Sequence, residues 1–356
     1  MTGTTYAGVS GTTDARPVVT YFTITSARYF PGAVALINSL RLTGNTGDVV
    51  VVDSGLTPWQ KERLAGVATI VPLDVPQRVT PAFYKAYMGE SLSGDIVVYL
   101  DSDMIVTDML DVAIDPALEG RICAAPDLLP NRFFPEWHEL FALSAPLRQR
   151  TYVNSGFLVF APARWPLLLK RWRECCDRVL DLAPPMHSLP LEESLRDPCA
   201  FWDQDPLNAL LMSEVPSDSL ELIDEARVVT IHDMRRVRCV DADTLRCSLA
   251  GRDTLILHCM DGPKPWMSNG WMAVADDAYV RLFPRLLFAN DVVLRLNRSE
   301  LPLWLRGGLR TRAVVPALHA SMTAARTLSR ALPRPVYERT VTPLRARLRG
   351  LGRTHP

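Results

Sequence analysis

Long apolar runs and paired cysteines are both missing from this chain of 356 residues. No stretch reaches the roughly 18 to 20 consecutive apolar residues that a membrane-spanning helix needs. The N-terminal MTGTTYAGVSGTTDARP has neither the basic region nor the apolar run of a secretory signal, so we expect a cytoplasmic protein. The seven cysteines include no CxxC pair, which argues against a structural zinc site or a disulfide framework.

Lysine is scarce and unevenly distributed. The chain has four lysines against 35 arginines, so Lys85 and Lys264, which stand in segments with other polar candidates, are informative positions. Residues 301–356 contain eleven arginines, no lysine and a single acid, Glu338. This tail therefore carries a formal charge of +10 and the body −10, although the whole chain is neutral.

The Arg-rich tail admits two interpretations. As a basic helical segment with Leu, Val and Trp304 between its arginines, it could lie on the cytoplasmic face of an anionic membrane, where each basic residue adds about 1 kcal/mol. It could equally fold back on the acidic body. Nucleic acid is a less favoured partner, because no stacking aromatic residues accompany the charge.

The rest of the chain has the pattern of one α/β domain over residues 17–300, preceded by a Gly-, Thr- and Ser-rich segment, 1–16, that we expect to be disordered. Short β-branched runs alternate with amphipathic stretches, which indicates a parallel sheet buried on both faces. We expect strands at 18–24, 48–53, 95–103, 121–126, 152–160 and 254–259, and helices at 31–42, 58–66 and 81–92. Two longer segments, 127–150 and 183–200, are predicted to be binding loops, the first with a partly aromatic surface from Phe133, Phe134, Trp137 and His138.

The strongest local signal is LDSDMIV, where an apolar strand runs into Asp101 and Asp103. Alternate residues at a strand end can point to the same side, and ligands of open α/β sheets bind beyond the carboxyl ends of strands. Two carboxylates there could hold a divalent cation that neutralises a diphosphate. Acidic pairs also cap helices and turns, so the motif alone leaves both interpretations open.

A second signal is LHCMDGPKPW, which follows a short predicted strand. His258 could provide an imidazole ligand, and Lys264, between two prolines, a compact cation for phosphate oxygens. A satisfied core histidine at a strand end is the alternative for His258.

A third signal is FWDQDPLNALL, in which Asp203, Gln204 and Asp205 precede an amphipathic run. Asp205 followed by Pro206 is an ordinary helix start, with Asp as the N-cap and Pro in the first position. Gln204 has no such explanation, and its amide could donate to and accept from sugar hydroxyls.

The fourth signal is a pair of short polar segments, AAPD and VNSGF. Asp127 follows one predicted strand and Asn154 opens another, while Gly156 would permit close approach of a ligand or a neighbouring backbone. Turn formation explains both polar residues equally well.

Taken together and in their order along the chain, the four signals resemble the retaining glycosyltransferases of family 8, over about residues 18–270. The resemblance implies a GT-A fold, a Rossmann-like mixed sheet flanked by helices with inserted acceptor loops. It further implies transfer of a hexose from a nucleotide diphosphate sugar, expected to be a UDP-sugar, to an acceptor, with Mn²⁺ as the cofactor, Mg²⁺ as the alternative, and retention of anomeric configuration.

The resemblance also implies roles for individual residues, which are the metal ligands Asp101, Asp103 and His258; the donor contacts Thr23, Thr25, Tyr29, Lys85, Ser102, Asn154 and Lys264; and the catalytic, sugar-contacting residues Asp127, Asp203 and Gln204. Two places depart from the family pattern. Ala27 and Arg28 stand before Tyr29 where the family has an Asp, and Asp261 stands in a glycine position of the family's H-x-x-G-x-x-K-P-W motif. The spacing from His258 to Lys264 is kept.

Two other classes of function remain open at this point. A nucleotide-sugar-binding protein without catalytic activity would have the same fold, and loss of a metal ligand would be its sign. A metal-dependent nucleotidyltransferase or phosphohydrolase would use the same acidic pair but would not need the DQD and NSG segments.

Overall fold

The computed structural model describes residues 17–91, 93–182, 191–230, 233–260, 264–267 and 277–306. The segment 1–16 and the tail beyond residue 306, for which the sequence suggested disorder and membrane contact, lie outside the described residues. So do the first eight residues of the 183–200 segment.

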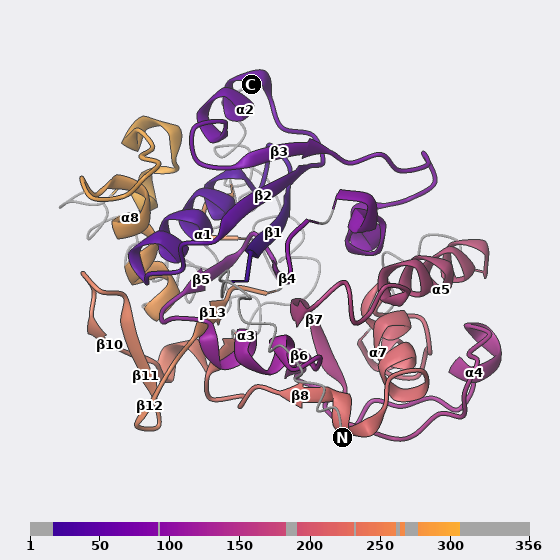
Figure 1. Cartoon of the computed structure of the whole chain (residues 1–356). Coiled ribbons are helices and arrows are strands. Elements are labelled where there is room, and N and C mark those ends of the chain that lie inside the picture. Colours follow the sequence, from indigo (N-terminus) through magenta and orange to yellow (C-terminus); the bar gives the residue numbers. More distant parts are fainter. Residues whose placement is uncertain are drawn as a thin grey trace, which may run out of the picture.

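A seven-stranded mixed sheet is the centre of the molecule (Figure 1). Its strands, in spatial order, are β3 (Thr69–Pro72), β2 (Asp48–Asp53), β1 (Val19–Thr25), β4 (Ile96–Leu100), β7 (Val153–Phe160), β6 (Ile122–Pro126) and β8 (Leu220–Leu222). The first four run parallel, and β7 is antiparallel to both β4 and β6. The parallel half was predicted; the reversal at β7 was not visible in the strand pattern.

Two smaller sheets lie beside it. One has the order β5 (Met104–Val106), β13 (Ile256–His258) and β9 (Val228–Thr230), and the other consists of β10 (Arg238–Asp241), β11 (Arg246–Leu249) and β12 (Arg252–Asp253). Because β13 pairs antiparallel with β5, His258 stands opposite Met104, directly after the acidic pair. This pairing brings together two parts of the chain that are more than 150 residues apart.

Helices cover both faces of the central sheet. The helical elements are α1 (Phe30–Leu42), α2 (Pro58–Leu64), α3 (Asp111–Leu118), α4 (Trp137–Leu140), α5 (Leu168–Leu182), α6 (Leu191–Ser194), α7 (Gln204–Ser213) and α8 (Ala278–Phe288), with the 3₁₀ turns η1 (Pro81–Ser91), η2 (Ser217–Ser219), η3 (Met234–Arg236), η5 (Arg298–Glu300) and η6 (Leu303–Leu305). Helices α4, α5 and α7 form a group on one side of the molecule (Figure 1). The predicted helix over 81–92 is a 3₁₀ helix.

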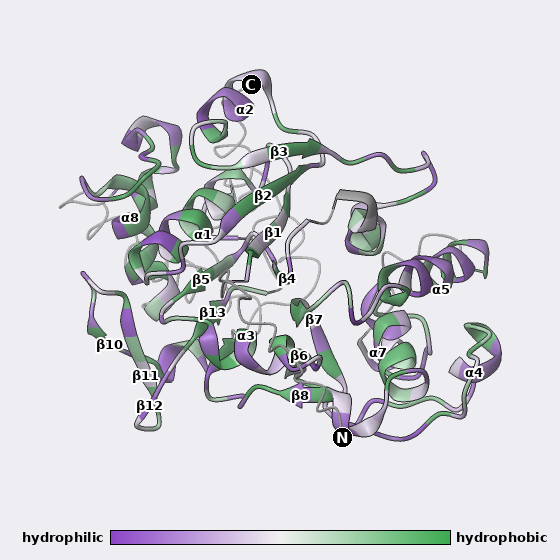
Figure 2. Cartoon of the chain, viewed as in Figure 1, coloured by the Kyte–Doolittle hydropathy of each residue, from purple (hydrophilic) through white to green (hydrophobic). Residues whose placement is uncertain are grey.

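Each face of the sheet has its own apolar core. One core joins α1, α3 and α8 to alternate residues of β1, β2 and β4; the other joins η1, α5 and α7 to the remaining ones. Figure 2 shows hydrophobic colouring along β2 and hydrophilic colouring over much of α5, as expected for a buried strand and a helix with one solvated face. None of the described helices is long and apolar enough to cross a bilayer.

The cysteines are free thiols, and all except Cys239 are buried. The absence of a disulfide framework stays a prediction, and the Sγ atoms of Cys239 and Cys247 lie 3.5 Å apart. Trp137, by contrast, was expected to contribute to an aromatic surface and is wholly buried, with its indole N–H donating to the carbonyl of Pro198 at 2.7 Å. Its ring packs against Phe133, Phe134 and Tyr152, so this part of the 127–150 segment is core rather than surface.

Candidate active site

The acidic pair stands in a tight turn between β4 and β5. The N–H of Met104 donates to the carbonyl of Asp101 at 3.1 Å, which closes the turn. The sequence pattern suggested that the two aspartates are alternate residues at the end of one strand. This is wrong, because strand β4 ends at Leu100. The turn is held at both ends, because the N–H of Asp101 donates to the carbonyl of Gly156 and the N–H of Cys259 to that of Asp103.

His258 completes a three-residue cluster with this pair. Its Nε2 atom lies 3.3 Å from Asp103 Oδ1 and 3.7 Å from Asp101 Oδ2. One ligand atom from each of the three residues lies within 4.8 Å of the other two. Two carboxylates and an imidazole at this separation can share one divalent cation.

Gly156 makes room for the cluster. A Cβ atom at this position would lie 2.6 Å from Asp101 Oδ2 and 2.8 Å from the Cε1 atom of His258, too close for either side chain to stay in place. The close approach expected at this glycine is therefore made by the side chains of two predicted metal ligands.

Two of the four lysines border the cluster. Lys264 Nζ lies 2.5 Å from Asp103 Oδ2, and Lys85 Nζ lies 3.1 Å from Asp101 Oδ2 and 3.7 Å from Asp203 Oδ2. Lys85 also donates to the hydroxyl of Ser155 at 3.1 Å. The ammonium groups thus hold three carboxylates from two distant parts of the chain in one small volume.

The burial of these charges alters their acidity. Burial alone would raise the pKa of Asp103, but Lys264 and His258 together hold it well below its ordinary value. Burial alone would lower the pKa of Lys85, whereas Asp101 and Asp203 raise it above the ordinary value. Lys85 and Asp103 are therefore both charged at neutral pH.

Asp203 is placed differently from the other two carboxylates. It is the N-cap residue of α7 and is 7% exposed, and burial raises its pKa although Lys85 opposes this. Its Oδ2 atom accepts no hydrogen bond from any residue that the structure describes. A buried carboxylate oxygen with spare capacity is costly unless something else supplies a partner, which makes this atom a candidate ligand contact.

The remaining predicted sugar contacts form a hydrogen-bonded chain from β6 to α7. The Asn154 amide donates to Asp127 Oδ2 at 3.0 Å, and Asn154 Oδ1 accepts from the N–H of Gly156 at 2.9 Å. Gln204 Oε1 accepts from the N–H of Ser155 at 3.0 Å. Strand β7 is therefore the element that connects the predicted sugar contacts to the ion cluster.

Four of the predicted donor contacts, Thr23, Thr25, Ser102 and Tyr29, are buried or partly buried. Thr23 and Thr25 are both buried, and the hydroxyl of Thr23 has no hydrogen-bond partner within the described ranges. Ser102 is buried as well, with its carbonyl oxygen against Gly32 of α1. Tyr29 is partly buried and meets Trp266 edge to face, with 6.3 Å between ring centroids.

The structure also assigns neighbours that the sequence did not indicate. The Tyr99 hydroxyl donates to Asp101 Oδ1 at 2.7 Å, while Lys85 donates to the other oxygen, Oδ2. Asp205 forms an ion pair with Arg132, 73 residues earlier. The prediction that Asp205 is the N-cap of this helix is therefore wrong: α7 begins at Gln204 with Asp203 as its N-cap, and Asp205 lies in the first turn as an ion-pair partner.

Comparison with known proteins supports the fold. No protein-family model matches the sequence, and no curated protein matches it. Among solved structures, the chain is similar to an active-site mutant of LgtC, with a TM-score of 0.52 and 17% identity over 79% of this chain and 100% of that one. It is also similar to the galactosyltransferase LgtC in complex with donor and acceptor sugar analogues, with a TM-score of 0.50 and 17% identity over 76% and 98% of the two chains. The fold of this chain is therefore the GT-A fold of these glycosyltransferases, as the sequence resemblance implied.

Proposed function

We propose that the chain is a metal-assisted, retaining glycosyltransferase that uses a nucleotide diphosphate sugar, with uridine as the preferred base. One observation carries the proposal: Asp101, Asp103 and His258 converge from two distant segments, with Lys264 at the same place. Carboxylate and imidazole ligands next to a lysine suit an ion that binds a diphosphate.

The charges of the site support an additional cation. Three carboxylates, those of Asp101, Asp103 and Asp203, face two ammonium groups, those of Lys85 and Lys264, which leaves one negative charge uncompensated. The mixed donor set of Asp101, Asp103 and His258 fits Mn²⁺ well and also admits Mg²⁺. When bound there, such an ion would neutralise the charge that builds on the terminal phosphate as the nucleoside diphosphate departs.

The protein's own residues divide the remaining work. Lys264 is placed to bind diphosphate oxygens, and Lys85 holds Asp101 and Asp203 at a fixed separation. Tyr99 fixes the second oxygen of Asp101. Because donors and charges fixed in advance need little reorganisation during reaction, this arrangement favours charge development on the leaving group.

We infer retention by front-side attack. A glutamine amide is a poor nucleophile, so Gln204 is assigned to orienting the transferred sugar, together with Asp127, Asn154 and Asp203. The acceptor hydroxyl oxygen bonds to the anomeric carbon on the face from which the phosphate oxygen departs. The hydroxyl proton passes to the departing diphosphate, so no enzyme nucleophile is required.

The two other classes of function fit the site less well. A binding protein without catalytic activity would not need all of Asp101, Asp103, His258 and Lys264 in one cluster. A nucleotidyltransferase or phosphohydrolase leaves Gln204 and Asn154 without a substrate group to contact. The two similar LgtC structures, one an active-site mutant and one with donor and acceptor sugar analogues, add support for sugar transfer at the level of the fold.

A panel of nucleotide sugars, tested with and without Mn²⁺, would examine the proposal directly. We expect one UDP-sugar to raise the melting temperature only when Mn²⁺ is present, because an ion held by Asp101, Asp103 and His258 would neutralise the charge of the diphosphate. Incubation of that donor with candidate acceptors should then release UDP with transfer of the sugar. Release of pyrophosphate or of a nucleoside monophosphate would identify a different enzyme class, and no product in any arm would favour a binding protein.

Membrane contact by residues 301–356 remains a separate prediction. Flotation of the full-length chain with anionic vesicles should exceed flotation of a chain that ends at residue 306. Equal recovery of the two would reject it.

A further inference from the structure

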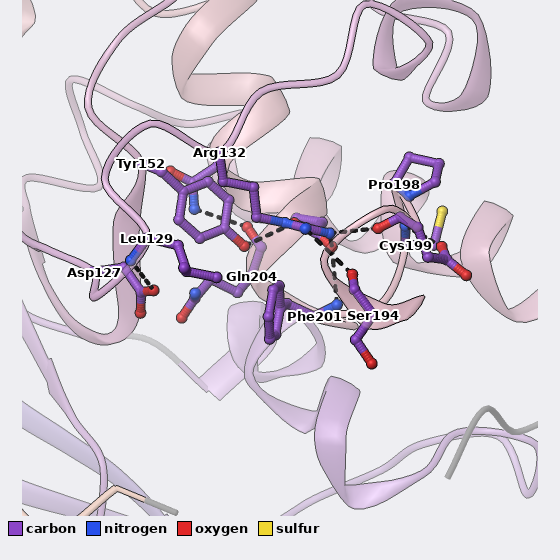
Figure 3. Close-up of polar contacts among 12 residues, drawn as sticks. Asp127, Leu129, Arg132, Tyr152, Ser194, Pro198, Cys199, Phe201 and Gln204 are labelled. Carbon is purple, nitrogen blue, oxygen red and sulfur yellow. Dashed lines mark hydrogen bonds and ion pairs between the residues drawn. The ribbon is translucent and has the colours of Figure 1, made fainter. Parts of the chain in front are cut away.

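A buried ion pair joins the two inserted segments to helix α7 (Figure 3). The Arg132 guanidinium donates from Nε to Asp205 Oδ1 at 2.7 Å and from NH2 to Asp205 Oδ2 at 2.8 Å. Its remaining donors reach the carbonyl oxygens of residues 194, 195 and 197. The Arg132 side chain is 3% exposed and that of Asp205 is fully buried.

Both carboxylate oxygens of Asp205 have all their hydrogen bonds supplied by the protein. Besides the guanidinium, its carboxylate accepts from the Tyr152 hydroxyl at 2.7 Å and from the N–H of Phe201 at 2.9 Å. The guanidinium also lies over the rings of Phe134 and Phe201, at 4.7 Å and 4.4 Å from their centroids. No charge or lone pair of this carboxylate is left for a substrate.

Helix α7 is fastened to strand β7 by a row of side chains next to this pair. Asn208 bonds both the N–H and the carbonyl of Val153, at 2.7 Å and 2.8 Å. One turn earlier, Gln204 Oε1 accepts from the N–H of Ser155. The Gln204 side chain also lies close enough to the Tyr152 hydroxyl to oppose the burial that raises the pKa of this phenol.

These contacts decide which way the Gln204 amide points. Its carbonyl oxygen is committed to strand β7, so the group that remains for a ligand is the NH₂ donor. The Tyr152 hydroxyl gives its proton to Asp205, so toward Gln204 it is an acceptor. A flipped amide would put two acceptors together and would also leave the N–H of Ser155 unpaired, which makes the flip unfavourable.

We propose that Tyr152 and Arg132 are positioning residues, which hold the Gln204 amide with its NH₂ group directed at the transferred sugar. Arg132 orients Asp205, Asp205 fixes the Tyr152 hydroxyl, and that hydroxyl fixes the amide. The inference rests on the proposed function, since it names the role of a residue in that same site. It also connects the two predicted binding loops, 127–150 and 183–200, to the predicted sugar contact Gln204 through one guanidinium.

Stability alone is a weak reason for such a pair. Replacement of a buried ion pair by apolar residues of similar volume is often neutral or stabilising, because the cost of removing both charges from water is then avoided. An arginine fork, unlike an apolar contact, defines a direction in space. Orientation of the neighbouring groups is therefore what this pair supplies.

The gentlest test is Tyr152→Phe, which removes one hydroxyl and keeps the ring that packs on Trp137. We expect kcat to fall about tenfold with little change in the KM of the donor, as for loss of a hydrogen bond to a positioned group. In the Gln204→Ala background the same substitution should cost nothing further, because Tyr152 acts through Gln204. Additive losses in the double variant would overturn the proposal.

A second measurement does not depend on activity. The chain has four glutamines, so their side-chain NH₂ signals in a ¹⁵N-glutamine-labelled protein can be assigned by single substitutions, that of Gln204 by Gln204→Ala. We expect the Gln204 NH₂ signal to shift and to exchange faster with water in Tyr152→Phe. An unchanged signal would overturn the proposal even if the wild-type protein proved to have no transferase activity.

Arg132→Lys extends the test to the guanidinium and has a matched control. Lysine keeps the charge but loses the fork, so we expect the Gln204 NH₂ signal to change as in Tyr152→Phe. Arg148→Lys alters an arginine of the same segment that bonds the carbonyls of Ser213 and Val215 at the other end of α7. The Gln204 signal should be unaffected there; equal changes in both variants would indicate general loosening and contradict a specific role for Arg132.

Discussion

Asp203 and Asp205 stand two residues apart at the start of helix α7, and their surroundings differ in one decisive respect. Asp205 is surrounded by a guanidinium fork, a phenol and a backbone N–H, so that each of its oxygens has protein partners. Asp203 has one oxygen with no hydrogen-bond donor among the described residues and a lysine 3.7 Å away. Both residues are buried, Asp203 at 7% exposure and Asp205 at 0%.

The difference separates two uses of a buried charge. Around Asp205 the charges cancel and the hydrogen bonds are complete, which is the condition for a buried ion pair to persist as a structural element. Around Asp203, Asp101 and Asp103, negative charge remains in excess. These three carboxylates, together with His258, form what we call the incomplete cluster. It is stable only with a further partner, and a cation with a polar ligand is the partner that fits.

The largest expected effect comes from Asp103→Asn, which removes a charge from the incomplete cluster. We expect the transfer rate to fall on the order of 1,000-fold, because a metal ligand and the fixed charge beside Lys264 are lost together. Mn²⁺ titration calorimetry should show loss of binding, while the circular dichroism spectrum stays that of the wild type. A variant that still binds Mn²⁺ with wild-type affinity would remove Asp103 from the metal site.

The converse change is Asp205→Ala, which breaks the complete pair. Leaving Arg132 buried without its counter-ion should lower the free energy of unfolding by about 3 to 5 kcal/mol. Urea denaturation would measure it, and Arg132→Met combined with Asp205→Ala should recover part of the loss because no unpaired charge remains. If Asp205→Ala were as stable as the wild type, the contrast between the two aspartates would disappear.

The sequence predicted the incomplete cluster better than the buried ion pair of Asp205 and Arg132. Asp101, Asp103 and His258 belong to short patterns whose order along the chain resembles a known family, so their convergence could be expected. Nothing in the sequence near Arg132 identifies Asp205 as its partner, since the pairing depends on how the 127–150 segment returns to α7. The N-cap pattern at Asp205–Pro206 also favoured a local role for a residue whose contacts are mostly tertiary.

The fold was predictable to a similar degree. Continuous apolar runs such as that of β2 indicated the parallel half of the sheet, because such strands are buried on both faces. Strand β7 is just as apolar and yet runs antiparallel, since strand direction depends on the connection and not on composition. The turn that carries the aspartates was predicted to be strand, because DSD interrupts two apolar stretches only briefly.

Gly156→Ala should weaken the incomplete cluster without removing any of its ligands. The added Cβ would lie within 2.8 Å of both Asp101 and His258 side-chain atoms, so the two ligands must move apart. We expect the affinity for Mn²⁺ to fall about tenfold, the scale seen when a group that orients metal ligands is altered. Gly66→Ala is the control, because a Cβ there meets no atom within 4 Å. Equal affinities in the two variants would show that the cluster tolerates displacement.

The smallest effect concerns the pH dependence of Asp203, and it tests whether this carboxylate is held at a cost. Burial raises the pKa of Asp203 above its ordinary value of 3.8. Such a group stabilises the fold fully below pH 3.8, and that contribution is lost as pH rises through the raised pKa. Asp203→Asn is neutral at every pH, so in metal-free protein its stability relative to the wild type should increase between pH 4 and pH 7. Chemical denaturation at both pH values would measure the change. A constant difference would mean that Lys85 offsets the burial of Asp203 fully, and that its free oxygen is no strain on the fold.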